Sequence, residues 1–296
     1  MSYDSLAAYI SALPRTHRRL LCKYTQQCTD LQLWRAFRSR RRLEVITDGG
    51  LQATSGTFGW KLVDNRKLVL YSGSGPVDGP FDSANSTCCE IGGCAAPLLL
   101  ITVIAKYWGI RHRCKLHWIV DSKAAISKVS VNIRPGATPC RQPNEFDLLA
   151  FIEMLQKELR RPIKITWVKG HQDATTPYDK LSHHVQMNVD ADKLATNHRN
   201  QSLPQSSQTV DHLPSSRVSI ILNGRQLTSN IDSSIRYHVN GYHMRLYLQK
   251  RHSWSDQVWN TVDLRLFGRH FTNSLRQQAG GGALMGSERE VDHAAL

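Results

Sequence analysis

The chain has 296 residues, enough for one domain of ordinary size with flanking segments or for two small domains. Lysine and arginine number 38 against 24 aspartates and glutamates, and the resulting net charge of +14 favours a polyanionic partner, nucleic acid before an anionic membrane. Seven scattered cysteines, an odd number, argue against a disulfide framework and favour a reducing intracellular compartment, either cytoplasm or nucleus.

Residues 1–42 are predicted to form a separate basic flank with helical patches. The stretch "RAFRSRRR", from Arg35 to Arg42, places five arginines in eight residues. Such a run is typical of a solvated basic patch or of a nuclear-import-like signal.

Three closely spaced apolar runs follow, and they predict an antiparallel meander of strands at Glu44–Thr47, Thr57–Val63 and Lys67–Ser72. The first run leads directly into Asp48 and two glycines. One interpretation is a turn aspartate that bonds its own backbone. The other is a carboxylate that meets further carboxylates, because a buried carboxylate is costly unless it is paired or binds a metal.

A helix is predicted around Glu90 to Tyr107. Its uncharged stretch, Ile91 to Ala105, is too short for a membrane span and contains Pro97, so it indicates a buried core helix. Gly92, Gly93 and Pro97 are poor helix formers, and a short or kinked turn is therefore expected at Glu90.

The remaining pattern alternates between strands and helices: a strand at Lys115–Asp121, a helix at Asn144–Leu159, a strand at Ile163–Gly170 and a short helix at Asn188–His198. Three strands followed by this alternation predict an α/β domain over residues 43–198, with one mixed five-stranded sheet flanked by helices. A Pro-rich loop is expected from Asn132 to Pro143. Residues 199–217 read as a linker, and 218–296 as a helix-rich extension with a disordered end.

Four carboxylates occupy suggestive positions in this scheme. Asp48 ends the first strand, Asp121 ends the fourth, Glu90 lies near the start of the first helix and Asp192 opens the last one. Sites in open sheets form where strand ends and helix starts meet. Converging carboxylates repel one another, and hard divalent cations such as Mg²⁺ relieve that repulsion. Two such ions about 4 Å apart can hold a scissile phosphate and activate water.

Five short motifs occur in order over about half of the chain: "TDGG" from Thr47, "STCCEI" around Glu90, "IVDSKAAI" around Asp121, "WVKGHQD" from Trp167 and "NVDADKLA" from Asn188. Together they resemble a type 1 ribonuclease H domain, of the kind found in retrotransposon reverse-transcriptase polyproteins. The resemblance implies a ribonuclease H-like fold and a two-metal endonuclease that cuts the RNA strand of RNA–DNA hybrids.

The resemblance also implies roles for individual residues. Asp48, Glu90, Asp121 and Asp192 would bind two Mg²⁺ ions, with Mn²⁺ as a substitute, and His171 would assist proton transfer or product release from a mobile loop. The implied partners are the hybrid and an upstream reverse-transcriptase segment, without a membrane.

The choice of the fourth carboxylate has three rivals, Asp173, Asp179 and Asp190. Asp190 and Asp192 are two residues apart on a helix and face nearly opposite sides, so only one can reach the metals. The spacing to Leu194 and Ala195 favours Asp192.

Two other functions fit the same charge and fold class. One is a catalytically inactive ribonuclease H-like module that binds nucleic acid or serves as a scaffold, because phosphate contacts alone give sequence-independent affinity. The other is an integrase-like nuclease. The positions of the four carboxylates, metal dependence and the choice of substrate separate these hypotheses.

Overall fold

The structure is a computed structural model that describes residues 3–52, 55–77, 85–110, 114–130, 145–201, 220–222, 225–227, 231–253, 255 and 257. The predicted Pro-rich loop, most of the predicted linker and the predicted disordered end lie outside the described residues. The chain divides into two compact units, Met1–Asp232 and Ser233–Leu296.

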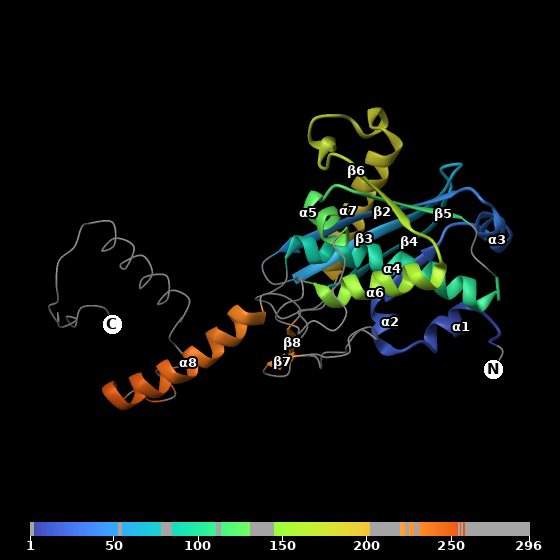
Figure 1. The fold of residues 1–296 in the computed structure, drawn as a ribbon. Coiled ribbons are helices and arrows are strands. Elements are labelled where there is room, and N and C mark those ends of the chain that lie inside the picture. The colour runs from blue at the N-terminus through green and yellow to red at the C-terminus, as the bar shows by residue number, and fades with distance from the viewer. Residues whose placement is uncertain are drawn as a thin grey trace. The chain divides into compact units, whose positions relative to one another are not determined.

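The elements follow one another as the ribbon in Figure 1 shows. The strands are β1 (Lys23–Gln26), β2 (Arg42–Gln52), β3 (Ser55–Asp64), β4 (Val69–Pro76), β5 (Lys115–Val120), β6 (Ile163–Trp167), β7 (Ile220–Leu222) and β8 (Arg225–Leu227). The α-helices are α1 (Leu6–Ser11), α2 (Arg15–Leu20), α3 (Asp30–Arg38), α4 (Ser86–Tyr107), α5 (Lys123–Val129), α6 (Phe146–Leu159), α7 (His183–Gln201) and α8 (Ile231–His252). Two 3₁₀ turns, η2 (Gln172–Ala174) and η3 (Tyr178–Lys180), lie between β6 and α7.

One mixed sheet organises the first unit, with strand order β1-β4-β3-β2-β5-β6. Strands β2, β3 and β4 pair antiparallel, whereas β5 and β6 run parallel to β2. This confirms the predicted α/β fold with a ribonuclease H-like sheet, in which an antiparallel meander is followed by parallel strands. Strands β7 and β8 form a small sheet of their own.

The main sheet has six strands where the sequence predicted five. The additional strand, β1, pairs antiparallel with β4 and belongs to the segment that was predicted as a separate flank. Its sequence "KYTQ" is short and mostly exposed, so it carries no alternating apolar pattern. Leu33 and Phe37 of α3 are fully buried in the main core, so this N-terminal segment packs as part of the same unit.

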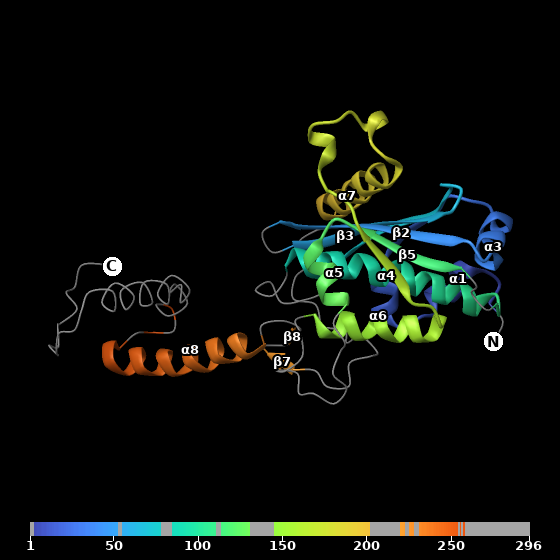
Figure 2. The ribbon, with the colours of Figure 1, turned by 45° about the horizontal axis from the view of Figure 1, so that its top comes forward.

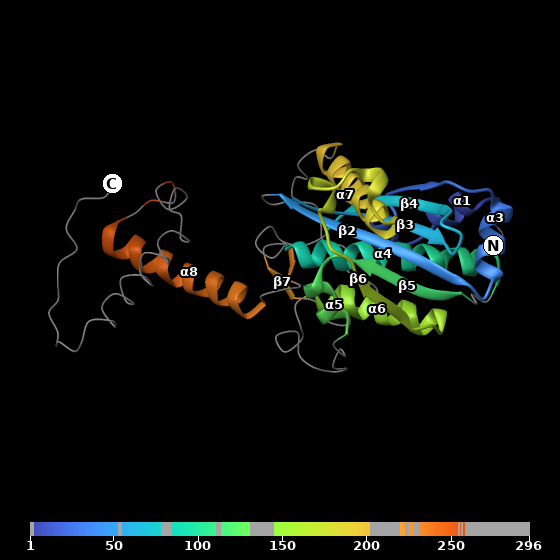
Figure 3. The same ribbon diagram turned by 90° about the horizontal axis from the view of Figure 1, so that it is seen from above.

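Helices cover both faces of the sheet. Helices α4 and α6 lie on one face and α7 lies on the other (Figure 2). The larger core fills the α4 face and includes Trp118, Ile101 and Phe151. A smaller apolar cluster, Ile46, Val63, Ile119 and Met187, lies on the α7 face. Seen from above, α7 runs across β2, β3 and β4 (Figure 3).

Helix α4 is continuous over 22 residues, and the predicted short or kinked turn at Glu90 is wrong. Pro97 lies inside it, and Asn85 caps its start by accepting a hydrogen bond from the Cys88 N–H. Burial on every side explains this, because tertiary packing outweighs the weak propensity of the sequence. Among the described helices α4 alone is long and apolar enough to cross a membrane, yet 94% of its most apolar window is buried, as predicted for a core helix.

Strand β2 continues past Asp48, so the turn interpretation of the two glycines is wrong. Gly49 and Gly50 pair with Phe58 and Thr57 of β3. A side chain at Gly49 would place its Cβ 2.6 Å from the backbone nitrogen of Glu90. Glycine is therefore required here because α4 lies directly against the strand.

A second glycine, Gly59, allows a helix backbone to approach the sheet closely on the opposite face. Gly59 of β3 is the register partner of Asp48, and a Cβ there would lie 2.0 Å from the carbonyl oxygen of Ala191 in α7. The hydroxyl of Thr57 also donates to the Ala195 carbonyl at 2.9 Å. Both helices thus dock on the sheet beside Asp48.

We expect Gly59→Ala to destabilise the protein by about 1–3 kcal/mol, because the added methyl group meets backbone atoms that cannot move aside locally. Urea unfolding measures the change. Gly50→Ala is the matched control, since its Cβ would meet side-chain atoms rather than backbone, the tip of Arg199 at 2.9 Å and the Thr57 hydroxyl at 3.8 Å. Equal stability of the two variants would contradict this account of helix docking.

Candidate metal centre

Three of the predicted ligands come together in space. Asp48 of β2, Glu90 of α4 and Asp121 after β5 each offer an oxygen, and these oxygens lie within 4.8 Å of one another. Asp48 and Glu90 are only 6% and 5% exposed, whereas Asp121 is half-buried. The cluster is therefore open to solvent mainly on the Asp121 side.

The backbone at Asp48 is fixed from both faces of the sheet. From the α7 face, the Asn188 side-chain amide donates to the Thr47 carbonyl oxygen at 3.1 Å and hydrogen-bonds Asp48 itself. From the α4 face, the indole N–H of the buried Trp118 donates to the Thr47 hydroxyl at 2.8 Å. These contacts hold the carboxylate in place without neutralising it.

The start of α4 is anchored by a buried polar group. The Asn85 amide donates to Glu145 at 2.7 Å, and Lys128 of α5 forms an ion pair with the same fully buried carboxylate. One turn further along, Glu90 is aimed at the cluster. Its Oε2 atom is buried and has no hydrogen-bond partner.

Asp121 is placed by the chain on either side of it. Ser122 caps α5 by accepting from the Ala125 N–H at 3.2 Å, and the Trp167 indole N–H donates to the Asp121 carbonyl oxygen at 2.8 Å. The loop after β6 lies close to the carboxylate, because a Cβ at Gly170 would be 2.1 Å from Asp121 Oδ2.

Asp192 lies within electrostatic range of the cluster, since its charge raises the pKa values of both Asp48 and Asp121. It is not among the three residues whose oxygens lie within 4.8 Å of one another. Asp190 points elsewhere, as predicted, and binds Lys61 Nζ at 2.5 Å and the Tyr178 hydroxyl at 3.0 Å.

The other predicted site residue, His171, is exposed at the start of η2 and has a left-handed backbone conformation, with φ of 52°. Burial raises the pKa of Asp121, and the charge of His171 opposes that shift. His171 is thus near the cluster but outside it. The rival acids Asp173 and Asp179 are exposed in the same connection.

The chain matches no family model and no curated protein. Among solved structures it is similar to the N-terminal RNase H domain of Rv2228c from Mycobacterium tuberculosis, at 19% identity and a TM-score of 0.36, over 54% of this chain and 94% of that one. It is also similar to LC11-RNase H1 from compost in complex with an RNA/DNA hybrid, at 12% identity and a TM-score of 0.39, over 54% and 99%. RNase H1 from Halobacterium salinarum is 17% identical with a TM-score of 0.35, and the match covers 54% of this chain and 99% of that one.

The electrostatics of the cluster favour bound cations. Burial, followed by repulsion from Asp121 and Asp192, raises the pKa of Asp48 to about 8. Burial and the charges of Asp48 and Asp121 raise the pKa of Glu90 well above its ordinary value. A set of hard oxygen donors with an unpartnered Glu90 oxygen fits Mg²⁺ or Mn²⁺, which prefer such ligands.

A second carboxylate on the same face of β2 has the opposite environment. Glu44, four residues before Asp48, lies beside Arg42 at 2.7 Å and His184 at 3.1 Å, with His117 at 3.8 Å. Burial acts to raise the pKa of Glu44, but the neighbouring His117 ring, the hydrogen bond from His184 and the positive charge of Arg42 outweigh it and lower the pKa to about 2. Glu44 is therefore a structural anion rather than a metal ligand of the cluster.

The sequence did not reveal that two further side chains, Asn188 and Trp167, hold the site in place. Asn188 precedes Asp192 by four residues and so shares its helix face, which is a signal that the sequence does contain. Trp167 gave no such signal. Its ring is 44% exposed, lies under Lys123 Nζ at 4.7 Å and reaches the Asp121 backbone only through the parallel pairing of β5 and β6.

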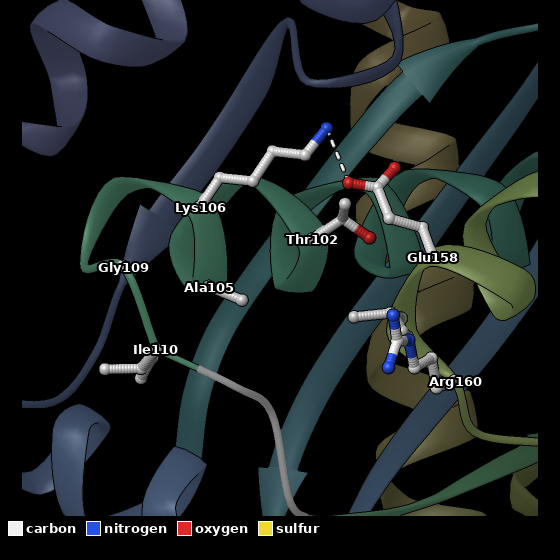
Figure 4. A pocket seen from close by; sticks show the side chains of 8 residues that line it. Thr102, Ala105, Lys106, Gly109, Ile110, Glu158 and Arg160 are labelled. Carbon is white, nitrogen blue, oxygen red and sulfur yellow. Dashed lines mark ion pairs between the residues drawn. The ribbon is translucent and has the colours of Figure 1, made fainter.

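A separate pocket of about 450 Å³ lies where the C-terminal ends of α4 and α6 meet (Figure 4). Lys106 and Glu158 form a 2.6 Å ion pair on its wall, next to Arg160. Twelve residues of α4 separate Glu90 from Thr102 in this pocket, which corresponds to about 18 Å along the helix. The pocket is thus distinct from the carboxylate cluster.

We expect Asp48→Asn to stabilise the metal-free protein, and more so at higher pH. A carboxyl with a folded pKa of about 8 keeps its proton while the unfolded chain loses it, so wild-type stability falls as pH rises from about 4 towards 8. The slope from this residue is at most about 1.4 kcal/mol per pH unit. Urea unfolding with EDTA at about pH 5 and pH 8 measures it. Parallel pH profiles for both proteins would contradict the raised pKa.

The two aspartates of α7 should differ in function. Asp192→Asn is expected to reduce metal-dependent activity strongly, because it removes a charge that acts on the cluster. Asp190→Asn should leave turnover within about twofold and lower stability slightly, because it breaks a partly exposed ion pair with Lys61. Initial rates and unfolding midpoints of both variants test this. Reversed effects on turnover would show that the wrong aspartate has been assigned.

Proposed function

We propose that this chain is a metal-dependent endonuclease that hydrolyses the RNA strand of RNA–DNA hybrids. The observation that carries the proposal is the convergence of Asp48, Glu90 and Asp121 within 4.8 Å, with an unpartnered oxygen on Glu90. A protein that used this fold only for binding would have no need of such a costly arrangement, because buried like charges destabilise the folded chain.

The residues divide the work as follows. Asp48, Glu90 and Asp121 would hold two divalent ions, with Asp192 beside them. Bound ions of this kind activate water and stabilise the leaving oxygen of a phosphodiester. His171, exposed and within electrostatic range of Asp121, would move a proton or assist product release.

Recognition of the hybrid would use the main chain near the cluster. Backbone groups of β2 beyond Asp48 and of the start of α4 would lie beside a ribose of the RNA strand and its 2′-hydroxyl. The net charge of +14 supports binding to a phosphate backbone. We further propose a retroelement origin and an upstream reverse-transcriptase segment as partner, supported by the order and spacing of the five sequence motifs.

The test is a cleavage assay with labelled RNA–DNA hybrid, duplex RNA and duplex DNA, each with Mg²⁺, Mn²⁺ or Ca²⁺. We expect cutting of the hybrid's RNA strand with Mg²⁺ or Mn²⁺, and binding without turnover with Ca²⁺, whose larger and irregular coordination fits the site poorly. Equal cutting of duplex DNA would favour the integrase-like nuclease instead. Binding of the hybrid without cutting under any ion would favour the scaffold module.

A further inference from the structure

The end of α7 places a cation beside the glycines that follow Asp48. A Cβ at Gly50 would lie 2.9 Å from Nη1 of Arg199, so the guanidinium occupies the space that a side chain of β2 would fill. Its charge also acts on the thiol of Cys89, the neighbour of Glu90 in α4. Arg199 therefore lies beside the end of β2, two turns of helix beyond Asp192.

Few of the N–H groups of the Arg199 guanidinium donate hydrogen bonds within the described part of the chain. Nη2 donates to the Thr196 hydroxyl at 3.3 Å, and Nε is buried without a hydrogen-bond partner. Among the described residues no carboxylate forms an ion pair with it. A half-buried guanidinium with unused donors is suited to an anion from outside the chain, because its fork matches two oxygens of a phosphate.

From this geometry we propose that Arg199 binds a backbone phosphate of the nucleic acid beside the end of β2. The inference rests on the proposed function, and it adds a binding residue that none of the five motifs contains. An arginine in the last turn of a helix also interacts favourably with the helix dipole. That structural role predicts a change in folding stability but no change in the salt dependence of binding.

The test measures binding of a short labelled RNA–DNA hybrid to the full chain carrying Asp48→Asn, which prevents cutting, at about 50–200 mM salt. We expect Arg199→Ala to weaken binding about tenfold, as for loss of one charge-assisted contact, and to reduce the slope of log Kd against log salt by about one. Arg199→Lys should keep most of the salt slope and lose part of the affinity.

Lys157→Ala is the matched control. It also removes one positive charge, but from an exposed position on α6, the helix that covers the opposite face of the sheet from α7 (Figure 2). Its binding should stay within about twofold of the parent. Equal losses in the two variants, or an unchanged salt slope for Arg199→Ala, would overturn the proposal.

Gly50→Ala provides an independent check, because its methyl group would displace the guanidinium without meeting backbone. It should weaken binding when Arg199 is present and have little further effect in Arg199→Ala. A full effect in both backgrounds would overturn the proposal, since the methyl group would then act on the hybrid directly.

If the wild type does not cut hybrid but Arg199→Ala weakens binding, the nuclease function fails and the phosphate site stands. If the wild type cuts the hybrid and Arg199→Ala binds it normally, the nuclease function stands and the phosphate site at Arg199 is overturned.

Discussion

Two close contacts without intervening side chains determine where everything else in the candidate site lies. Gly49 lets the backbone of α4 rest on β2, and Gly59 lets the backbone of α7 rest on β3 at the position paired with Asp48. Because both contacts occur at the same level of the sheet, a carboxylate from each helix arrives beside the strand. The acidic cluster is therefore a product of backbone packing, and side-chain chemistry alone would drive it apart.

The same strand carries two buried carboxylates in opposite electrostatic surroundings. Glu44 has an arginine and two histidines around it and a low pKa. Asp48, about 13 Å further along, accepts neutral hydrogen bonds from Asn188 and Gly49, and burial and the charges of Asp121 and Asp192 raise its pKa. The charge of Glu44 is thus balanced by side chains of the same chain, so this carboxylate can contribute to the stability of the fold. Asp48 depends on something the chain does not supply, and such uncompensated groups are a mark of functional sites.

The sequence predicted the mixed sheet with its flanking helices, and it singled out three acids that lie close together in the structure. Asp48, Glu90 and Asp121 were singled out because each lies at a predicted strand end or near a predicted helix start within a recognisable motif, and the structure brings these three together. Strand β1 was missed because its four polar residues show no periodicity, and β2 was cut short because two glycines look like a turn. Only the packing of α4 explains why they belong to the strand. Contacts of this kind join residues far apart in the chain, which local patterns do not record.

The raised pKa values of Asp48 and Glu90 mean that protons and cations compete for the same oxygens of the cluster. Near neutral pH the metal-free chain carries a proton on Asp48, whose pKa is about 8, and burial also raises the pKa of Glu90 above its ordinary value; a cation would bind these oxygens only as protons leave. Binding of a divalent ion would therefore be an exchange of hydrogen ions for that ion. Its apparent affinity would rise with pH, and binding would acidify a weakly buffered solution. A small fall in pH and a small fall in the concentration of the free divalent ion would then change occupancy in the same direction.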